Sequence, residues 1–317
     1  MKAGFELEHG RLVASNDPEA TVLVYVSPDE DERRQVVKSE EMDAFDIDSA
    51  LDPDEVSRAE LTSDRLSLIW KRPNSTSCDE ELQLDVSSLG LFLRQDRLLV
   101  ILNDGPIPFS AREFQGVESA PDVLLRFLLH TVRQYLSHLK VIKQLSRDLE
   151  SKVSASMENR YLLQMFALSE SLVYCLNAIE ANGAALVKLR GLADRIGLLR
   201  QHTEALDDLI LENQQCARQA RIYTDVLAGL MDARGTIVNN NMNVLLKNLT
   251  LINIIFLPLN LIASIGGMSE YSMMTRGIHW LVSYAALSLG MVVLGWATWW
   301  ILVRALDGDA RRKRAGV

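Results

Sequence analysis

Residues 239–269 read NNNMNVLLKNLTLINIIFLPLNLIASIGGMS, and this stretch decides what kind of protein the chain forms. From Leu249 to Gly267 it contains no charged residue. A helix of about 20 apolar residues is long enough to cross the roughly 30 Å hydrocarbon core of a bilayer. The stretch therefore predicts a transmembrane helix, which we assign to residues 247–268.

The predicted span has one polar face. Residues taken at every third or fourth position form a stripe, which consists of Asn239, Asn243, Leu246, Thr250, Asn253, Leu257, Asn260 and Ser264. Because an unpaired amide in hydrocarbon costs about 2–7 kcal/mol, Asn253 and Asn260 are expected to face either a partner helix or water. We favour water, in a pore where Leu246 and Leu257 form apolar constrictions that gate by dewetting.

A second uncharged run, residues 278–303, predicts another crossing helix, joined to the first by an outer loop at residues 269–277. Its histidine and tryptophans lie toward the two ends, where interfacial anchors are expected. The tail, residues 304–317, holds four Arg, one Lys and two Asp. By the positive-inside rule this tail and Lys247 are cytoplasmic, so we expect an inner-membrane protein with both termini inside.

Composition excludes several classes of function. The net charge is −9, and no basic patch with interleaved aromatic residues occurs, which argues against nucleic-acid binding. The chain contains no GxxxxGK[ST], GxGxxG or GxSxG motif, so we expect neither ATP chemistry nor an enzyme. The three cysteines, Cys78, Cys175 and Cys216, lack CxxC spacing and indicate structural thiols in a reducing compartment. No apolar signal-like segment follows Met1, so we expect the soluble part to stay cytosolic.

The rest of the chain predicts an α+β fold. Residues 1–118 form a cytosolic α/β domain, in which strands are expected at residues 4–15, 20–28, 65–72, 82–93 and 97–104. Acidic first turns and helical spacing predict short helices within residues 27–45 and 52–63.

Residues 119–246 have a long helical pattern with few breakers. Two helices are expected at residues 123–153 and 159–191, and a third begins near His202 and need not stop before the membrane. If that third helix is continuous, Asp225 and Asp232 lie on the same face as the stripe. They would form acidic rings that concentrate cations in a symmetric assembly, unless they belong to an ordinary solvated face.

Two spans per chain cannot enclose a pore, so the pore interpretation requires several copies around an axis. The amide and hydroxyl oxygens of the stripe suit the water shell of a hydrated divalent ion, because Mg²⁺ in particular dehydrates reluctantly.

Two segments, VLAGLMD (226–232) and FLPLNLIASIGGMS (256–269), together with the order of the predicted elements, resemble the CorA family of divalent metal-ion transporters. The resemblance implies a long stalk helix, a funnel-shaped homopentamer in membrane lipid, and passive transport of Mg²⁺, Zn²⁺, Co²⁺ or Ni²⁺ without a cofactor. The choice among these ions stays open. Gly267 and Met268 match the family's Gly-Met-Asn signature, whereas Ser269 stands in place of its asparagine.

This departure concerns the first recognition point for the ion in the family. Glu270, the next residue of the outer loop, is a candidate replacement or an ordinary exposed carboxylate. The resemblance also points to Asp208, and to Asp207 beside it, as ligands of a regulatory cytosolic metal. The alternative to a channel is a CorA-like membrane scaffold or metal-sensing protein that does not conduct.

Overall fold

The computed structural model describes the chain except residues 63–64, 79–80, 156–158 and 316–317, and it describes no side chain within 75–84, 153–159, 270–272, 302–303 and 305–317. The described chain divides into two compact units, Met1–Met231 and Asp232–Val317. The predicted boundaries at residues 118, 246, 268, 277 and 303 rest on composition, and remain predictions.

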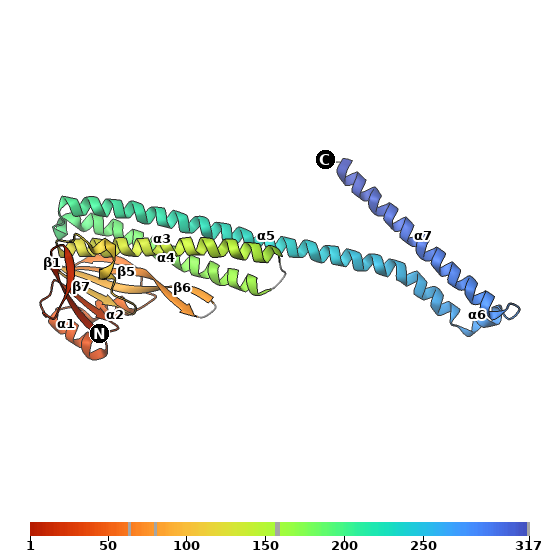
Figure 1. Ribbon diagram of the computed structural model, residues 1–317, viewed down its shortest axis with the longest axis horizontal. Helices are drawn as coiled ribbons and strands as arrows, with labels where there is room; N and C mark the ends of the chain where they lie inside the picture. The colour runs from red at the N-terminus through yellow and green to blue at the C-terminus, as the bar shows by residue number, and fades with distance from the viewer. Residues whose placement is uncertain (63–64, 79–80, 156–158, 316–317) are drawn as a thin grey trace. The chain divides into compact units, whose positions relative to one another are not determined.

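The first unit is built on a seven-stranded sheet (Figure 1). Its strands are β1 (Lys2–Glu8), β2 (Arg11–Ser15), β3 (Val22–Val26), β4 (Arg58–Leu61), β5 (Arg65–Cys78), β6 (Glu81–Arg94) and β7 (Arg97–Leu102). Their spatial order is β2-β1-β3-β7-β6-β5-β4, and only the β3–β7 pair is parallel. The interior strand β3 is buried on both faces, which explains its unbroken apolar sequence VLVYV.

Helices cover both faces of this sheet. Helices α1 (Glu30–Ser39) and α2 (Ala44–Leu51) cover one face, and α3 (Ala120–Ala155), α4 (Asn159–Ile196) and the first part of α5 (Arg200–Gly266) cover the other (Figure 1). Asp29 begins α1 with a capping box, because its side chain accepts from the N–H of Glu32 while the Glu32 side chain accepts from the N–H of Asp29.

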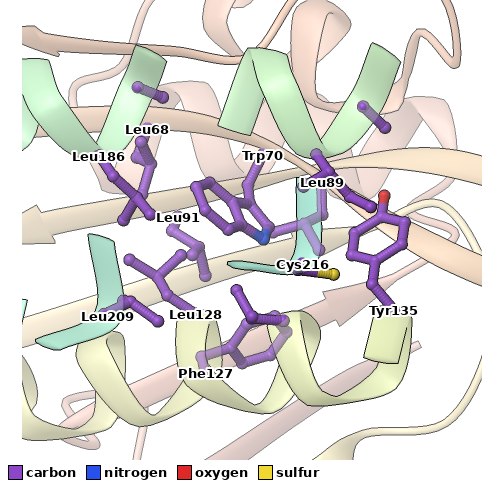
Figure 2. Close-up of a cluster of buried hydrophobic side chains, with 14 of the residues drawn as sticks. Leu68, Trp70, Leu89, Leu91, Phe127, Leu128, Tyr135, Leu186, Leu209 and Cys216 are labelled. Carbon is purple, nitrogen blue, oxygen red and sulfur yellow. The ribbon is translucent and has the colours of Figure 1, made fainter. Parts of the chain in front are cut away.

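The larger core lies under α3, α4 and α5. Trp70 of β5 is fully buried there, among leucines of β5 and β6 and side chains of all three helices, including Tyr135 and Cys216 (Figure 2). Burying one such large apolar side chain contributes about 1.5–3 kcal/mol. This core therefore ties the beginning of α5 firmly to the sheet.

A buried amide sets how α4 lies on the sheet. The Oδ1 atom of Asn182, a residue with 0% exposure, accepts from the Lys71 N–H at 3.0 Å and from the Ser57 hydroxyl at 2.7 Å, and its Nδ2 donates to the Lys71 carbonyl at 2.7 Å. The pairing of β4 with β5 ends at Arg58 and Ile69, two residues before Lys71. Asn182 thus supplies the hydrogen bonds that β4 would have made had it continued.

Three expectations were wrong in detail. The predicted helix at residues 52–63 is not found in residues 52–62, which form a turn and the edge strand β4, because pairing with β5 and burial of Ala59 outweigh the helical pattern; residue 63 lies outside the described residues. The expected strand 4–15 is the β1–β2 hairpin, whose turn uses the positive φ angles of His9 and Gly10. The predicted outer loop contains a short helix, α6 (Ser269–Met274).

The predicted continuity of the third helix is confirmed, since α5 runs from Arg200 to Gly266 without interruption at Gly235 or Pro258. Three helices of the described chain are long and apolar enough to span a membrane: α4, α5 and α7 (Trp280–Ala315). In α4, 39% of the apolar window is buried, against 6% in α5 and α7. Because α4 packs on the sheet, we assign it to the soluble core and the other two to the membrane.

Candidate functional site

The second unit is a helical hairpin formed by the end of α5, the short α6 and α7 (Figure 1). The helices approach closely where one of them has a glycine. A Cβ atom added to Gly266 would lie 2.4 Å from the Leu287 Cδ2, and one added to Gly295 would lie 3.6 Å from the Leu259 Cδ1. Small residues allow this approach in membrane helices. Leu259 and Gly266 therefore mark the face of α5 that contacts α7.

The stripe lies on the opposite face of α5. With 3.6 residues per turn, Asn253, Leu257 and Asn260 project roughly 100–160° around the helix axis from Leu259. Both amides are exposed, and Leu257 is 71% exposed. Among the described residues, no side chain of α7 makes a hydrogen bond with either asparagine. The second span of the same chain thus leaves both amides uncapped.

The other stripe residues share this exposure. Leu246 is 53% exposed. Four polar members are exposed as well: Asn239, Asn243, Thr250 and Ser264. The Thr250 hydroxyl donates to the Leu246 carbonyl at 2.8 Å, so its oxygen offers only acceptor capacity to anything outside the helix. The structure places the predicted set along one face of a single helix.

Proline interrupts the hydrogen bonding of α5 within the span. Pro258 has no N–H, so the Ile254 carbonyl loses its usual helical donor. Inside a bilayer such a carbonyl needs water or a partner group. The freed acceptor lies one turn from Leu257, the second predicted constriction.

The signature residues follow directly after α5. Gly267 and Met268 donate their backbone N–H groups to the carbonyls of Ala263 and Ile265, both at 3.1 Å, and Ser269 begins α6. Met268 and Ser269 are exposed. The side chain of Glu270, the predicted outer-loop carboxylate, lies outside the described residues.

The stalk acids occupy the surface of α5. Asp225 belongs to the first unit and Asp232 to the second, and both are exposed. Asp207 is engaged within its own chain, since its Oδ1 accepts from the Arg190 Nε at 2.7 Å. That ion pair raises the pKa of Arg190 through the hydrogen bond to Asp207.

Asp208 lines a cavity of about 520 Å³ between α3 and α5. Three further carboxylates line it, Glu118, Asp122 and Glu212, together with two arginines, Arg126 and Arg133, of which Arg133 lies 3.8 Å from Glu212. His202, 4% exposed, joins the two helices there, because its Nε2 lies 3.1 Å from the Asp122 Oδ1 and its Nδ1 accepts from the Leu199 N–H. The described residues of this single chain contain no cluster of three or more His, Cys, Asp or Glu arranged to hold a metal.

Sequence reasoning missed this grouping. Glu118 and Asp122 are 90 and 86 residues before Asp208 in the chain, and no spacing rule connects them. The available signal was local: Ser119 followed by Asp122 forms a helix start, in which the Ser119 hydroxyl donates to the Asp122 carboxylate at 2.9 Å.

Two buried thiols and two partly buried histidines lie in the first unit, away from the stripe. Cys175 and Cys216 are free and buried, and burial raises the pKa of each to about 12, so both stay protonated. The side chain of Cys78 lies outside the described residues. Burial lowers the pKa of His130, despite Glu113 at 3.6 Å, and also that of His138.

Comparison with known proteins decides the family. The model of the "CorA-like Mg2+ transporter protein" family matches residues 22–312. The chain belongs to this family. It is 26% identical over 252 residues to the cobalt/magnesium transport protein CorA of Methanocaldococcus jannaschii, covering 76% of this chain and 77% of that protein.

Several solved structures show the same fold. The complete CorA magnesium transporter from M. jannaschii matches with a TM-score of 0.78 at 21% identity, covering 96% of this chain and 98% of that one. Full-length CmaX matches with a TM-score of 0.71 at 15% identity, covering 95% of this chain and 96% of that one. The cytoplasmic domain of ZntB from Vibrio parahaemolyticus matches with a TM-score of 0.60 at 12% identity, covering 76% of this chain and 98% of that one.

The predicted family and α+β fold are thereby confirmed. The chain is a membrane protein of a divalent-cation transporter family, not an enzyme.

Proposed function

We propose that the protein is a passive divalent-cation channel in which α5 helices from several identical subunits, five in the expected assembly, surround a water-filled axis. The observation that carries this proposal is the position of Asn253 and Asn260. Both amides lie on the face of α5 away from α7, with no hydrogen-bonding partner among the described residues. Since such amides are costly against lipid, copies of the same face around water are their most favourable surroundings.

The chemistry of the stripe favours a hydrated hard ion. Its polar members offer amide and hydroxyl oxygens but no imidazole, thiolate or fixed charge. Oxygen acceptors of this kind bind the water shell of Mg²⁺ without stripping it, and the weak binding permits release. We therefore propose Mg²⁺ as the principal cargo, with Co²⁺, Ni²⁺ and Zn²⁺ as the ions to compare.

The proposed orientation follows the distribution of positive charge. Lys247 precedes the first span, and the basic tail follows the second, so both termini are cytoplasmic and the short α6 is outside. Asp232 and Asp225 would then form acidic rings on the cytoplasmic side of the span, where they concentrate cations.

Flux through purified protein in liposomes tests the path. Asn260→Leu is expected to abolish Mg²⁺ uptake, because it replaces a water-facing amide by an apolar side chain in every subunit. Asn248→Leu is the matched control: it makes the same chemical change on the same helix, but Asn248 lies within about 20° of Leu259 on the α7 side. Equal loss in both variants, or none in Asn260→Leu, would remove the stripe from the mechanism.

Ser269 favours one alternative, a non-conducting scaffold, because it lacks the amide of the family signature. If the parent protein carries none of the four ions while it remains folded and oligomeric, the scaffold replaces the channel. If it conducts, Ser269→Asn tests the signature position, and Glu270→Gln tests whether the neighbouring carboxylate recruits the cation.

We also propose that Asp208 belongs to a cytosolic metal sensor that closes the channel when internal metal is plentiful. Its support is that Asp208 lines one cavity with the carboxylates of Glu118, Asp122 and Glu212, four acidic groups against the two arginines of the lining, whereas Asp207 is already paired with Arg190. Asp208→Ala is expected to shift inhibition by internal Mg²⁺ to higher concentration. Asp148→Ala, an exposed acidic residue on α3, is the control, and coincident inhibition curves for Asp208→Ala and the parent would refute the assignment.

A further inference from the structure

Helix α4 has an exposed side that is mostly apolar. Leu163, Phe166, Val173 and Tyr174 are each between 50% and 67% exposed, and they recur at a spacing that places them on one side of the helix. Between Leu163 and Tyr174 the only charged residue in the sequence is Glu170, which is exposed and forms no ion pair with the described residues. These five residues make up the α4 face.

A groove of complementary character lies between α3 and α5. It encloses about 240 Å³, and its apolar lining includes Ile222 and Val226 of α5, which are 59% and 52% exposed. Lys143, Arg147 and Glu150 of α3 line it as well, and all three are exposed. None of the three is ion-paired within the described part of the chain, so the α3–α5 groove carries a net charge of +1.

The helices α3 and α4 lie on different sides of α5. Glu212 of α5 lies 3.8 Å from Arg133 of α3, whereas Asp207 of α5 pairs with Arg190 of α4 at 2.7 Å. With 3.6 residues per turn, Glu212 and Asp207 project roughly 140° apart around α5. Another side of α5, with the buried Cys216, faces the core. When copies share an axis next to α5, the α4 side of one copy therefore faces the α3 side of the next.

The α4 face and the α3–α5 groove also lie at the same height along the helices. The two helices α3 and α4 run in opposite directions (Figure 1), and the Lys152 Nζ lies 6.0 Å from the centroid of the Tyr161 ring. Arg147 of the groove and Phe166 of the face are each five residues from this contact. Rotation about an axis parallel to the helices keeps every residue at its height, so the two surfaces can meet around a ring.

We propose that the α4 face of one copy docks in the α3–α5 groove of the next copy, with Glu170 beside Lys143 and Arg147. This inference rests on the proposed assembly of several copies around α5. Opposite charges set into two apolar surfaces favour their association and fix its register. Because two different surfaces of the chain meet, the interface is heterologous, and its repetition forms a closed ring instead of stopping at a dimer.

Disulfide cross-linking of the full-length protein in detergent, in a Cys78→Ser background, tests this contact. A chain with both Phe166→Cys and Val226→Cys should form a series of cross-linked multimers when copper phenanthroline oxidises the thiols. Each single variant should form none, because neither surface meets a copy of itself. Val187→Cys with Val226→Cys is the matched control, since Val187 is 58% exposed but lies roughly 30 Å further along α4 than Phe166.

Reversal of charge tests the proposed register. Glu170→Lys in the double-cysteine chain should slow cross-linking by about tenfold, because a positive charge then meets Lys143 and Arg147. A further Arg147→Glu exchange should restore the rate, and a helix that was merely disrupted by Glu170→Lys would not recover in this way. The thermal midpoint of each variant verifies that it is folded.

Two results would overturn the proposal. Cross-linked dimers of the Phe166→Cys variant alone would show that the α4 face meets a copy of itself. Absence of multimers from the double-cysteine chain, while light scattering shows that it is oligomeric, would refute the contact and leave the proposed channel standing, as when detergent or lipid fills the groove. A monomeric parent protein would refute the contact and the channel together.

Discussion

Replacement of Asn182 by alanine tests whether a single amide holds the stalk assembly on the sheet. The amide forms three hydrogen bonds, with the Lys71 N–H, the Lys71 carbonyl and the Ser57 hydroxyl, at 2.7–3.0 Å. Asn182 is fully buried, and Ser57 is 6% exposed, so water cannot readily replace the lost partner. Asn182→Ala would leave three buried polar groups unsatisfied.

Each buried group left without a partner costs about 1–3 kcal/mol. Alanine regains a few tenths of a kcal/mol through its better helix propensity, which offsets little of this. We therefore take about 3 kcal/mol as the net loss of local stability, which is about 1 kcal/mol, the low end of the range, for each of the three groups. Since 1.4 kcal/mol corresponds to a factor of ten, local opening should become about 100-fold more frequent.

Hydrogen–deuterium exchange of the peptide that contains the Lys71 amide measures this opening directly. Asn177→Ala is the matched control, because Asn177 lies on the same helix with an exposed side chain. We expect exchange at Lys71 to accelerate about 100-fold in Asn182→Ala and to stay unchanged in Asn177→Ala. If the two variants exchange alike, α4 is held by apolar packing, and the amide is dispensable.

Two further predictions concern helix glycines and a partly buried histidine. Gly191→Ala should stabilise the protein by about 0.5–1 kcal/mol and so raise the thermal midpoint, because the added Cβ atom meets open space in a helix interior. Gly183→Ala should lower the midpoint, since its Cβ would lie 2.9 Å from the Asn213 Nδ2, which donates to the Ile179 carbonyl; a rise in both would refute this packing. Burial lowers the pKa of His138, so the unfolded chain binds the proton more readily, and stability falls as pH drops below about 6.5. The fall in thermal midpoint across this pH should be smaller in His138→Gln, and equal falls in variant and parent would exclude His138 as a contributor.

Sequence patterns predicted the elements that are marked by a local run of apolar residues or by a regular repeat of apolar and polar residues. The stalk helix was predictable because its apolar and polar residues recur at the helical period through both compact units. β3 was predictable because VLVYV is apolar on both faces. Charge-free length identified both spans.

Features that depend on distant pairing were not predictable. β4 reads as helical, and only its pairing with β5 makes it a strand. Asn182 resembles any helix-surface asparagine until Lys71 is seen beside it. Likewise, only the strand register places Arg65, Arg94 and Arg97 on neighbouring strands side by side. The helical period of the sequence determines which residues share one face of α5. Which surface that face meets is determined by the assembly of several chains.

Accessibility of single cysteines along α5 tests the shared wet axis most directly. In a Cys78→Ser background, cysteines replace the stripe residues Asn253 and Asn260, or Leu259 and Ile255, which lies within about 40° of Leu259 around the helix axis. The native Cys175 and Cys216 are buried. The account predicts that a charged methanethiosulfonate reagent modifies the stripe cysteines in liposomes and blocks Mg²⁺ flux, while those on the contact face stay unmodified. Unmodified stripe cysteines, or equal modification on both faces, would contradict a water-filled path along this side of α5.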